Sequence, residues 1–320
     1  MRRFASVLGV CVLLVAGVVP VQAASVPSVA ADAATRPMIM MRVVGSKPAR
    51  PHRGSNQLYF HGGSPAVETS TGNEVYLVFW GSQWNNNDPS GEAQKLRNFF
   101  GGVGGSSWNN SVTQYCQGVA VGTTVTPCTG SGAATNPTGA LANYWYDNNS
   151  AAPAHPTQSQ LAAEAVNAAN KFGNTTIALN AKVQYVIATA TGNNSTGFGT
   201  QYCAWHSSTS STIGTIAYTN MPYITDAGAA CGANFNGLGP DAGITIVGGH
   251  EFAETETDIF PNGGWLDGNG SENGDKCAWI SSGQGAAALV TFTNGSSYPL
   301  QSLWSNASNS GSGGCVLSYP

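Results

Sequence analysis

Residues 248–258 bring together residue types that can bind a metal ion and activate water. His250 and Glu254 are four positions apart, and Glu251 follows the histidine directly. On a helix, positions i and i+4 share one face, so both side chains can hold one ion while Glu251 serves as general base toward a water molecule. This is the chemistry of the His-Glu-x-x-His metallopeptidases, with Glu254 in place of the second histidine.

A catalytic zinc site needs a third protein ligand and keeps a fourth position for water. Glu272 and Asp275, which follow the helix after a glycine-rich turn, are the best candidates. We assign Glu272 to the metal and Asp275 to the outer shell, where it holds His250 in its tautomer, and these two roles can be exchanged. His206 is a further candidate, either as a ligand or as a catalytic donor to the developing oxyanion.

Zn²⁺ is the expected ion at this site. One histidine and two glutamates are more anionic than a usual zinc site, so Mn²⁺ is an alternative. Asp267, Asn269 and Ser271 alternate as ligands do in calcium loops, but Glu272 stands where an EF-hand loop needs glycine. A Ca²⁺ site of another kind therefore stays open as a second alternative.

Acidic residues are concentrated in this part of a chain that is otherwise poor in charge. From residue 55 onward the sequence has 15 acidic residues and five basic ones, and seven of the acids fall between residues 248 and 277. A solvated acidic helix face is the simple explanation, but such crowding is repulsive unless a cation or protons offset it. The net negative charge argues against nucleic acid or an anionic membrane surface as a partner.

The N-terminal segment is typical of an exported protein. Basic residues at positions 2 and 3, an apolar run over 7–19 and Ala23 predict a signal peptide over residues 1–23, and the run is too short to span a membrane. Residues 24–57, rich in Arg and Pro, are expected to be a propeptide or disordered lead-in. Residues 58–320 then form a single domain, which we expect to be secreted, extracellular and monomeric, and to act on a peptide, protein or cell-wall substrate.

Six cysteines remain after the predicted signal peptide, and an even number in an exported chain favours disulfides. They allow 15 pairings. The simplest joins neighbours in sequence, namely Cys116 with Cys128, Cys203 with Cys231, and Cys277 with Cys315.

Hydrophobic patterns predict strands over 74–81, 183–190 and 215–218. They predict helices over 90–100, ended by Gly101-Gly102, and from a capping Thr157 to Gly173. A third helix is expected from an N-cap at Asp241 to about Asp258, ahead of Pro261. The alternation indicates an α/β or α+β fold with a central mixed sheet, flanking helices, a zincin-like active-site helix, many loops and disulfide staples.

Five blocks of this sequence resemble the phosphate-induced protein (EXORDIUM-like) family of plants and its secreted bacterial relatives. In order along residues 58–280 they are Tyr59-Phe60-His61-Gly62-Gly63, Val75-Tyr76-Leu77-Val78-Phe79-Trp80-Gly81, Cys203-Ala204-Trp205-His206, His250-Glu251-Phe252-Ala253-Glu254, and Gly264-Trp265-Leu266-Asp267 with Glu272-Asn273-Gly274-Asp275-Lys276-Cys277. The resemblance implies an exported protein of the extracellular space or the cell wall, and it implies no particular reaction.

Two functions of different class are compatible with these observations. The first is a secreted metal-dependent hydrolase of the zinc metallopeptidase type, and the alternative is a non-catalytic extracellular or wall-associated binding protein with a degenerate metallopeptidase core. The hydrolase requires His250, Glu254 and Glu272 or Asp275 to converge within about 4 Å of one point. It also requires Glu251 to be open to a cleft.

Overall fold

The computed structural model describes residues 38–46 and 56–319, apart from residues 64, 68, 70–72, 125, 127–131 and 262. The expected signal peptide, residues 1–23, lies outside the described residues. All of the described residues belong to one compact unit. None of the helices among them is both long enough and apolar enough to cross a membrane.

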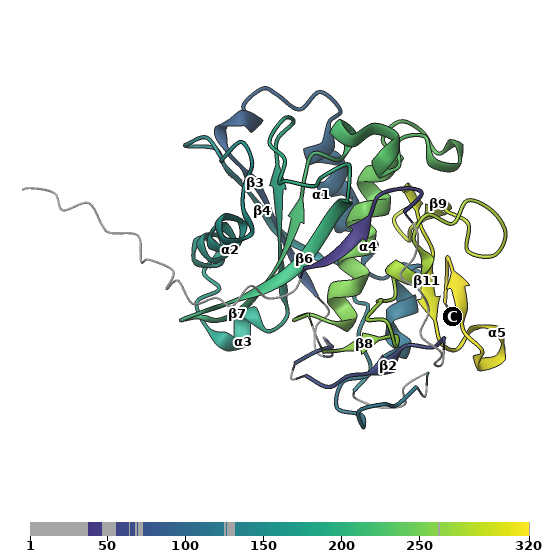
Figure 1. The fold of residues 1–320 in the computed structure, drawn as a ribbon. Coiled ribbons are helices and arrows are strands. Elements are labelled where there is room, and N and C mark those ends of the chain that lie inside the picture. The colour runs from purple at the N-terminus through teal and green to yellow at the C-terminus, as the bar shows by residue number, and fades with distance from the viewer. Residues whose placement is uncertain are drawn as a thin grey trace, which may run out of the picture. The chain divides into compact units, whose positions relative to one another are not determined.

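A six-stranded mixed sheet stands at the centre of the fold, in the order β1-β6-β7-β5-β3-β4 (Figure 1). Strands β7, β5, β3 and β4 run parallel, whereas β6 is antiparallel to β7 and β1 is antiparallel to β6. The central mixed sheet expected from the sequence is thereby confirmed. The strands are β1 (Ile39–Arg42), β3 (Glu74–Trp80), β4 (Leu141–Asp147), β5 (Val183–Thr189), β6 (Tyr202–Ser211) and β7 (Gly214–Met221).

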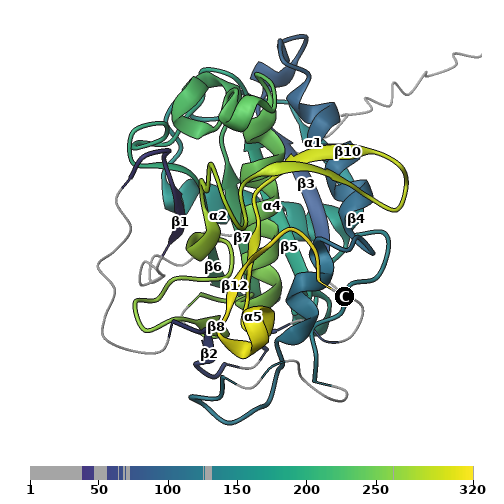
Figure 2. The same ribbon diagram turned by 90° about the vertical axis from the view of Figure 1, so that its right-hand side faces the viewer.

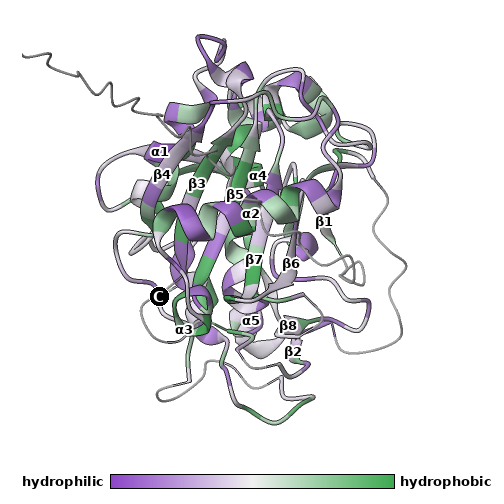
Figure 3. Ribbon diagram, turned by 90° about the vertical axis from the view of Figure 1, so that its left-hand side faces the viewer, coloured by the Kyte–Doolittle hydropathy of each residue, from purple (hydrophilic) through white to green (hydrophobic). Residues whose placement is uncertain are grey.

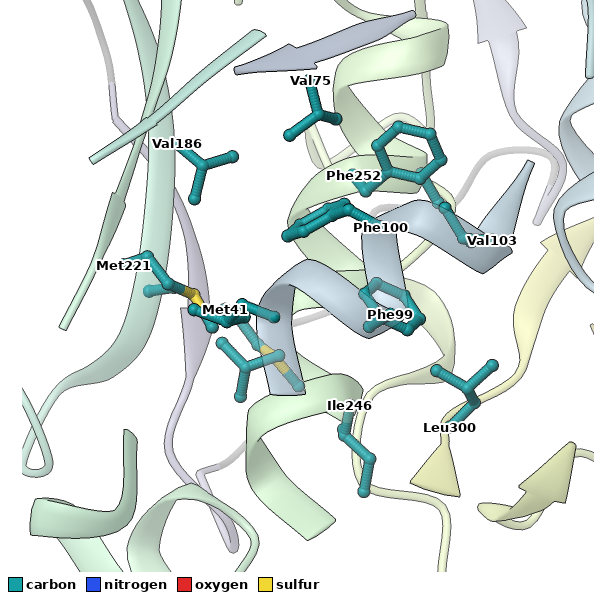
Figure 4. Packing of buried hydrophobic residues seen from close by; sticks show 14 of the residues in the cluster. Met41, Val75, Phe99, Phe100, Val103, Val186, Met221, Ile246, Phe252 and Leu300 are labelled. Carbon is teal, nitrogen blue, oxygen red and sulfur yellow. The ribbon is translucent and has the colours of Figure 1, made fainter. Parts of the chain in front are cut away.

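Helices cover both faces of this sheet, α2 (Gln158–Phe172) on one and α1 (Glu92–Val103) with α4 (Ala242–Thr257) on the other (Figures 1 and 3). Because both faces are covered, every residue of β5 is buried. Its Tyr185 packs in the cluster with α2, and its Val186 packs in the cluster with α1 and α4. Figure 4 shows part of the second cluster, where the aromatic rings of α1 meet α4.

The capping signals in the sequence predicted α2 correctly, but α1 and α4 only in part. Thr157 and Gln160 form the expected capping box at the start of α2, and Gly173 ends that helix in the left-handed conformation. By contrast, α1 does not end at Gly101-Gly102 but continues to Val103. Asp241 occupies the N-cap position of α4, yet its side chain makes no capping bond and pairs with Lys95 instead.

A C-terminal layer closes the outer side of α4, so that the helix lies between this layer and the sheet (Figure 2). For this reason all 16 residues of α4 are buried. The layer contains β9 (Ala288–Thr291) with β10 (Ser297–Leu300), and β11 (Leu303–Ser305) with β12 (Gly314–Val316). The remaining short elements are β2 (Tyr59–Phe60) with β8 (Trp265–Leu266), α3 (Ile177–Asn180), α5 (Ser308–Gly311) and the 3₁₀ turns η1 (Ser82–Trp84), η2 (Asn109–Gln114), η3 (Ile224–Cys231), η4 (Phe235–Gly237) and η5 (Asp275–Cys277).

Two of the three expected disulfides are present. Cys203 is bonded to Cys231, with Cα atoms 5.4 Å apart, and Cys277 is bonded to Cys315, with Cα atoms 5.7 Å apart. The third pairing involves Cys128, which lies outside the described residues. The second bridge ties the loop after β8 to β12 and thus fixes the acidic segment against the C-terminal layer.

Part of the segment expected as a propeptide or disordered lead-in is a strand. Residues 39–42 form β1 at the outer edge of the sheet, where they pair with residues 202–206 of β6. Met41 is completely buried and Val43 packs against the same core. The described fold therefore begins before residue 58, because an apolar segment within a basic stretch completes the sheet.

Candidate metal centre

The helix expected to carry the chemistry places its residues as the spacing predicted. His250 and Glu254 share one face of α4, with His250 Nε2 2.9 Å from Glu254 Oε1. Both side chains are fully buried. This nitrogen makes no hydrogen bond of good geometry among the described residues, so the contact is close without being a well-aligned bond.

Asp275 completes a first group around His250. Its Oδ1 lies 3.7 Å from His250 Nε2, and its backbone N–H donates to Glu254 Oε1 over 2.9 Å. One ligand atom from each of His250, Glu254 and Asp275 lies within 4.8 Å of the others, close enough to surround one ion. The structure thus brings Asp275, like Glu254, to Nε2 of His250.

Gln301 orients the His250 ring from the other side. Its amide nitrogen donates to the carbonyl oxygen of Gly274 (2.8 Å), so its Oε1 faces His250 Nδ1 at 3.3 Å. On this network Nδ1 carries a proton, and Nε2, which faces the carboxylates, is the nitrogen left for a ligand or a second proton. An imidazole held in this way is typical of metal ligands, whose second nitrogen is fixed by an outer partner.

Gly274 leaves the space that the ligands occupy. A Cβ atom at this position would lie 2.8 Å from His250 Nδ1 and 2.9 Å from Glu254 Oε1. Both distances are shorter than a carbon atom tolerates. The loop can therefore pass close to the centre only because residue 274 has no side chain.

His206 and Glu272 form a second group that shares Glu254. His206, on β6, has Nε2 3.4 Å from Glu272 Oε2 and Nδ1 3.6 Å from Glu254 Oε2. Ligand atoms of the three residues again lie within 4.8 Å of one another. Glu254 thus belongs to both groups, with one carboxylate oxygen near each histidine.

Glu251 lies beside the second group and is held by His206. Its Oε2 is 3.1 Å from His206 Nδ1, while Oε1 has no hydrogen-bond partner among the described residues. Burial raises the pKa of Glu251, and the hydrogen bond from His206 only partly opposes this. The side chain is 1% exposed, so the requirement that the base be open to a cleft is not met in this form.

The centre carries more negative charge than its own residues can offset. Four carboxylates meet two histidines, and both oxygens of Glu272 lack a hydrogen-bond partner among the described residues. Burial and the nearby Glu254 raise the pKa of Glu272. Burial alone would lower the pKa of His250, but the charge of Glu254 outweighs it and raises that pKa to about 10. Both shifts mean that the cluster binds protons unless another cation takes their place.

The alternative calcium loop is occupied by its own hydrogen bonds. Asp267 Oδ1 accepts from the backbone N–H groups of Asn269 (2.8 Å) and Ser271 (3.0 Å), and Oδ2 accepts from Lys276 (3.0 Å). Hence Asp267 is a turn-forming residue and has little capacity left for an ion. The same contact engages Lys276, the only lysine or arginine between positions 248 and 277.

The six residues that the sequence named as ligands or catalytic groups of the metal site thus lie in one buried cluster, namely His206, His250, Glu251, Glu254, Glu272 and Asp275. Five of the side chains are at most 2% exposed, and that of Asp275 is 22% exposed. Sequence analysis missed Gln301 and Gly274, since the first lies 51 residues beyond His250 and glycines are common in the whole chain. Comparison with protein-family models, curated proteins and solved structures finds no match to this chain.

Proposed function

We propose that this protein is a secreted, metal-dependent hydrolase of the peptidase type. The observation that carries the proposal is the buried cluster around Glu254, in which ligand atoms of two histidines and two further carboxylates converge, with Glu251 beside them. Secretion is supported by two disulfides and by the signal-like N-terminus.

The donor atoms fit a divalent transition metal. His250 Nε2, Glu254 Oε2 and both oxygens of Glu272 are buried without a hydrogen-bond partner among the described residues. Such atoms are costly to bury unless a cation or proton satisfies them. Imidazole nitrogens favour Zn²⁺, the excess of carboxylates admits Mn²⁺, and Ca²⁺ is disfavoured because it prefers oxygen ligands alone.

A bound ion would supply Lewis acidity that polarises a carbonyl group and makes water a better nucleophile at neutral pH. The chain's own part is proton transfer. Glu251 is the general base, since Oε1 is not engaged in a hydrogen bond among the described residues and a raised pKa suits proton transfer near neutrality. His206 fixes the orientation of that carboxylate through its Nδ1–H.

One observation favours the alternative function, a non-catalytic extracellular or wall-associated binding protein. Glu251 is 1% exposed, and neither substrate nor bulk water reaches it in the described form. A cavity of about 330 Å³, lined among others by Lys95, Asp241 and Pro299, lies at the other end of α4 and includes none of the cluster. If the centre never opens to solvent, a bound metal has a structural role, in which it neutralises the buried carboxylates and stabilises the core.

Metal analysis combined with Glu251→Gln decides between the two. We expect the purified protein to carry Zn²⁺ or Mn²⁺ and to cleave quenched-fluorescence peptides. Glu251→Gln should keep the metal and lose about 10²- to 10⁴-fold in rate, the usual contribution of a general base. Glu164→Gln is the matched control, a buried glutamate on α2 across the sheet.

Equal rates for the wild type and Glu251→Gln would rule out the proposed base. A purified protein without bound metal, which also fails to take up Zn²⁺ or Mn²⁺ in titrations, would rule out the hydrolase and leave the binding protein.

A further inference from the structure

Strand β1 occupies the edge of β6 at the position of the candidate centre. Its register pairs Ile39 with His206, Met40 with Trp205 and Met41 with Ala204, in antiparallel orientation. Paired residues on neighbouring strands share a face of the sheet, so position 39 is on the same face as His206. In Figure 1 the purple β1 runs beside β6, close to α4.

Strand β1 is short and lies at the edge of the sheet. Met41 is its fully buried anchor in the core near α4, while Met40 packs partly on the α2 face. Beyond the strand, Val44 N–H donates to Ala230 O (2.9 Å), and the Trp279 indole donates to Arg42 O (2.6 Å). Four paired residues with one buried anchor resemble a bound peptide more than a central strand of a sheet.

We propose that the edge of β6 is a binding surface for an extended peptide, and that residues 38–46 are its internal occupant, which keeps the centre closed. An extended chain adds to an exposed sheet edge through backbone hydrogen bonds, and pockets for alternate side chains supply selectivity. A peptide in the place of β1 runs antiparallel to β6 and passes His206. It places an unbranched apolar side chain in the site of Met41, two positions beyond the residue opposite His206.

This inference rests on the proposed function only in naming the bound peptide as the substrate. The surface can be tested without any measurement of catalysis.

The test uses the full chain with a site-specific protease sequence inserted after Ser46, cut only after folding. With a fluorophore on the N-terminal fragment, an excess of synthetic peptide 38–46 should displace that fragment, seen as a fall in anisotropy. Hydrogen exchange at residues 203–207 should rise while the edge is free.

The peptide carrying Met41→Asp should compete at least about tenfold more weakly, because it cannot bury the anchor. Met38→Asp is the matched control, since Met38 precedes the strand and is 36% exposed.

A fragment that stays bound under excess peptide, or a protein that unfolds when the fragment leaves, would overturn the proposal and make β1 an integral strand. Equal competition by the two aspartate peptides would also overturn it. Displacement without peptide hydrolysis by the Zn²⁺-loaded cut protein would leave the binding surface standing and count against the hydrolase. If the uncut chain hydrolyses peptides but the fragment of the cut chain is not displaced, the binding surface is overturned and the hydrolase is supported.

Discussion

At the level of single residues, Gln301 determines how His250 meets its partners. Its amide is fixed by the carbonyl of Gly274, so it accepts the proton of Nδ1 and leaves Nε2 for a ligand. The spacing of His250 and Glu254 revealed the ligand pair, because a helix brings i and i+4 together wherever it lies. No local rule connects residue 250 with residue 301, which meet only after the C-terminal layer packs on α4.

We expect Gln301→Leu to weaken metal binding by about 10- to 100-fold, the usual effect of losing an outer partner of a ligating histidine. Competition with a chelator of known affinity measures this change. Gln114→Leu is the control, since Gln114 is also fully buried but bonds to Ser111 and Ala307 away from the centre. Similar weakening in both variants would show a general effect on stability instead.

Gly274→Ala should also weaken metal binding, because its methyl group would lie within 3 Å of both His250 and Glu254. Gly268→Ala, in the same loop, has no atom within 4 Å of its new methyl group and should behave as the wild type. Isothermal titration with Zn²⁺ compares the two variants. Unchanged affinity in Gly274→Ala would mean that the loop moves aside when the ion binds.

At the level of elements, sequence patterns predicted buried, regular segments and missed polar or short ones. The apolar runs of β3 and β5 and the capping box of α2 were sufficient to predict these three elements. Strand β6 was missed because serines and a threonine follow His206, although Ser207, Ser208 and Thr209 are buried. Helix α1 passes Gly101-Gly102 because its second glycine packs against Asn294 and Phe292, a tertiary contact that overrides the local preference.

Helix α1 also carries a buried acid, Glu92, which accepts from Ile224 N–H over 2.9 Å. Burial raises its pKa to about 8, above that of the unfolded chain. Its contribution to stability is therefore complete below about pH 4.5 and is lost as the pH rises toward 8. In the wild type, this loss should lower the free energy of unfolding by ~3 kcal/mol between pH 5 and 8. Glu92→Gln, whose side chain does not ionise, should lack this part of the decline when both proteins are measured by urea denaturation. An unchanged pH profile would contradict this.

For the whole molecule, the centre links metal content to stability. Four carboxylates crowd around two histidines, so the metal-free protein must hold protons or bear repulsion. An ion at 100 times its dissociation constant adds about 2.7 kcal/mol to the folded state.

We therefore expect removal of the ion with EDTA to lower Tm by about 5 °C at this chain length, and added Zn²⁺ or Mn²⁺ to restore it. Differential scanning calorimetry of the same sample before and after chelation measures the shift. Glu254→Gln, which alters both groups at once, should show little response to either treatment. A wild-type Tm that is insensitive to chelator and to added metal would show that no ion supports this fold.

The candidate ligands come from β6, α4 and the loop after β8, and their outer partner Gln301 comes from the segment joining β10 to β11, so the set spans residues 206 to 301. No shorter portion of the chain contains the complete set, so the ion finds its full coordination only when these four segments have assembled. Uptake of metal by a nascent or refolding chain is then a late event that reports completion of the core. A chain shortened before Gln301 would keep both histidines and all four acids, yet it would lack the residue that decides which nitrogen of His250 faces the ion.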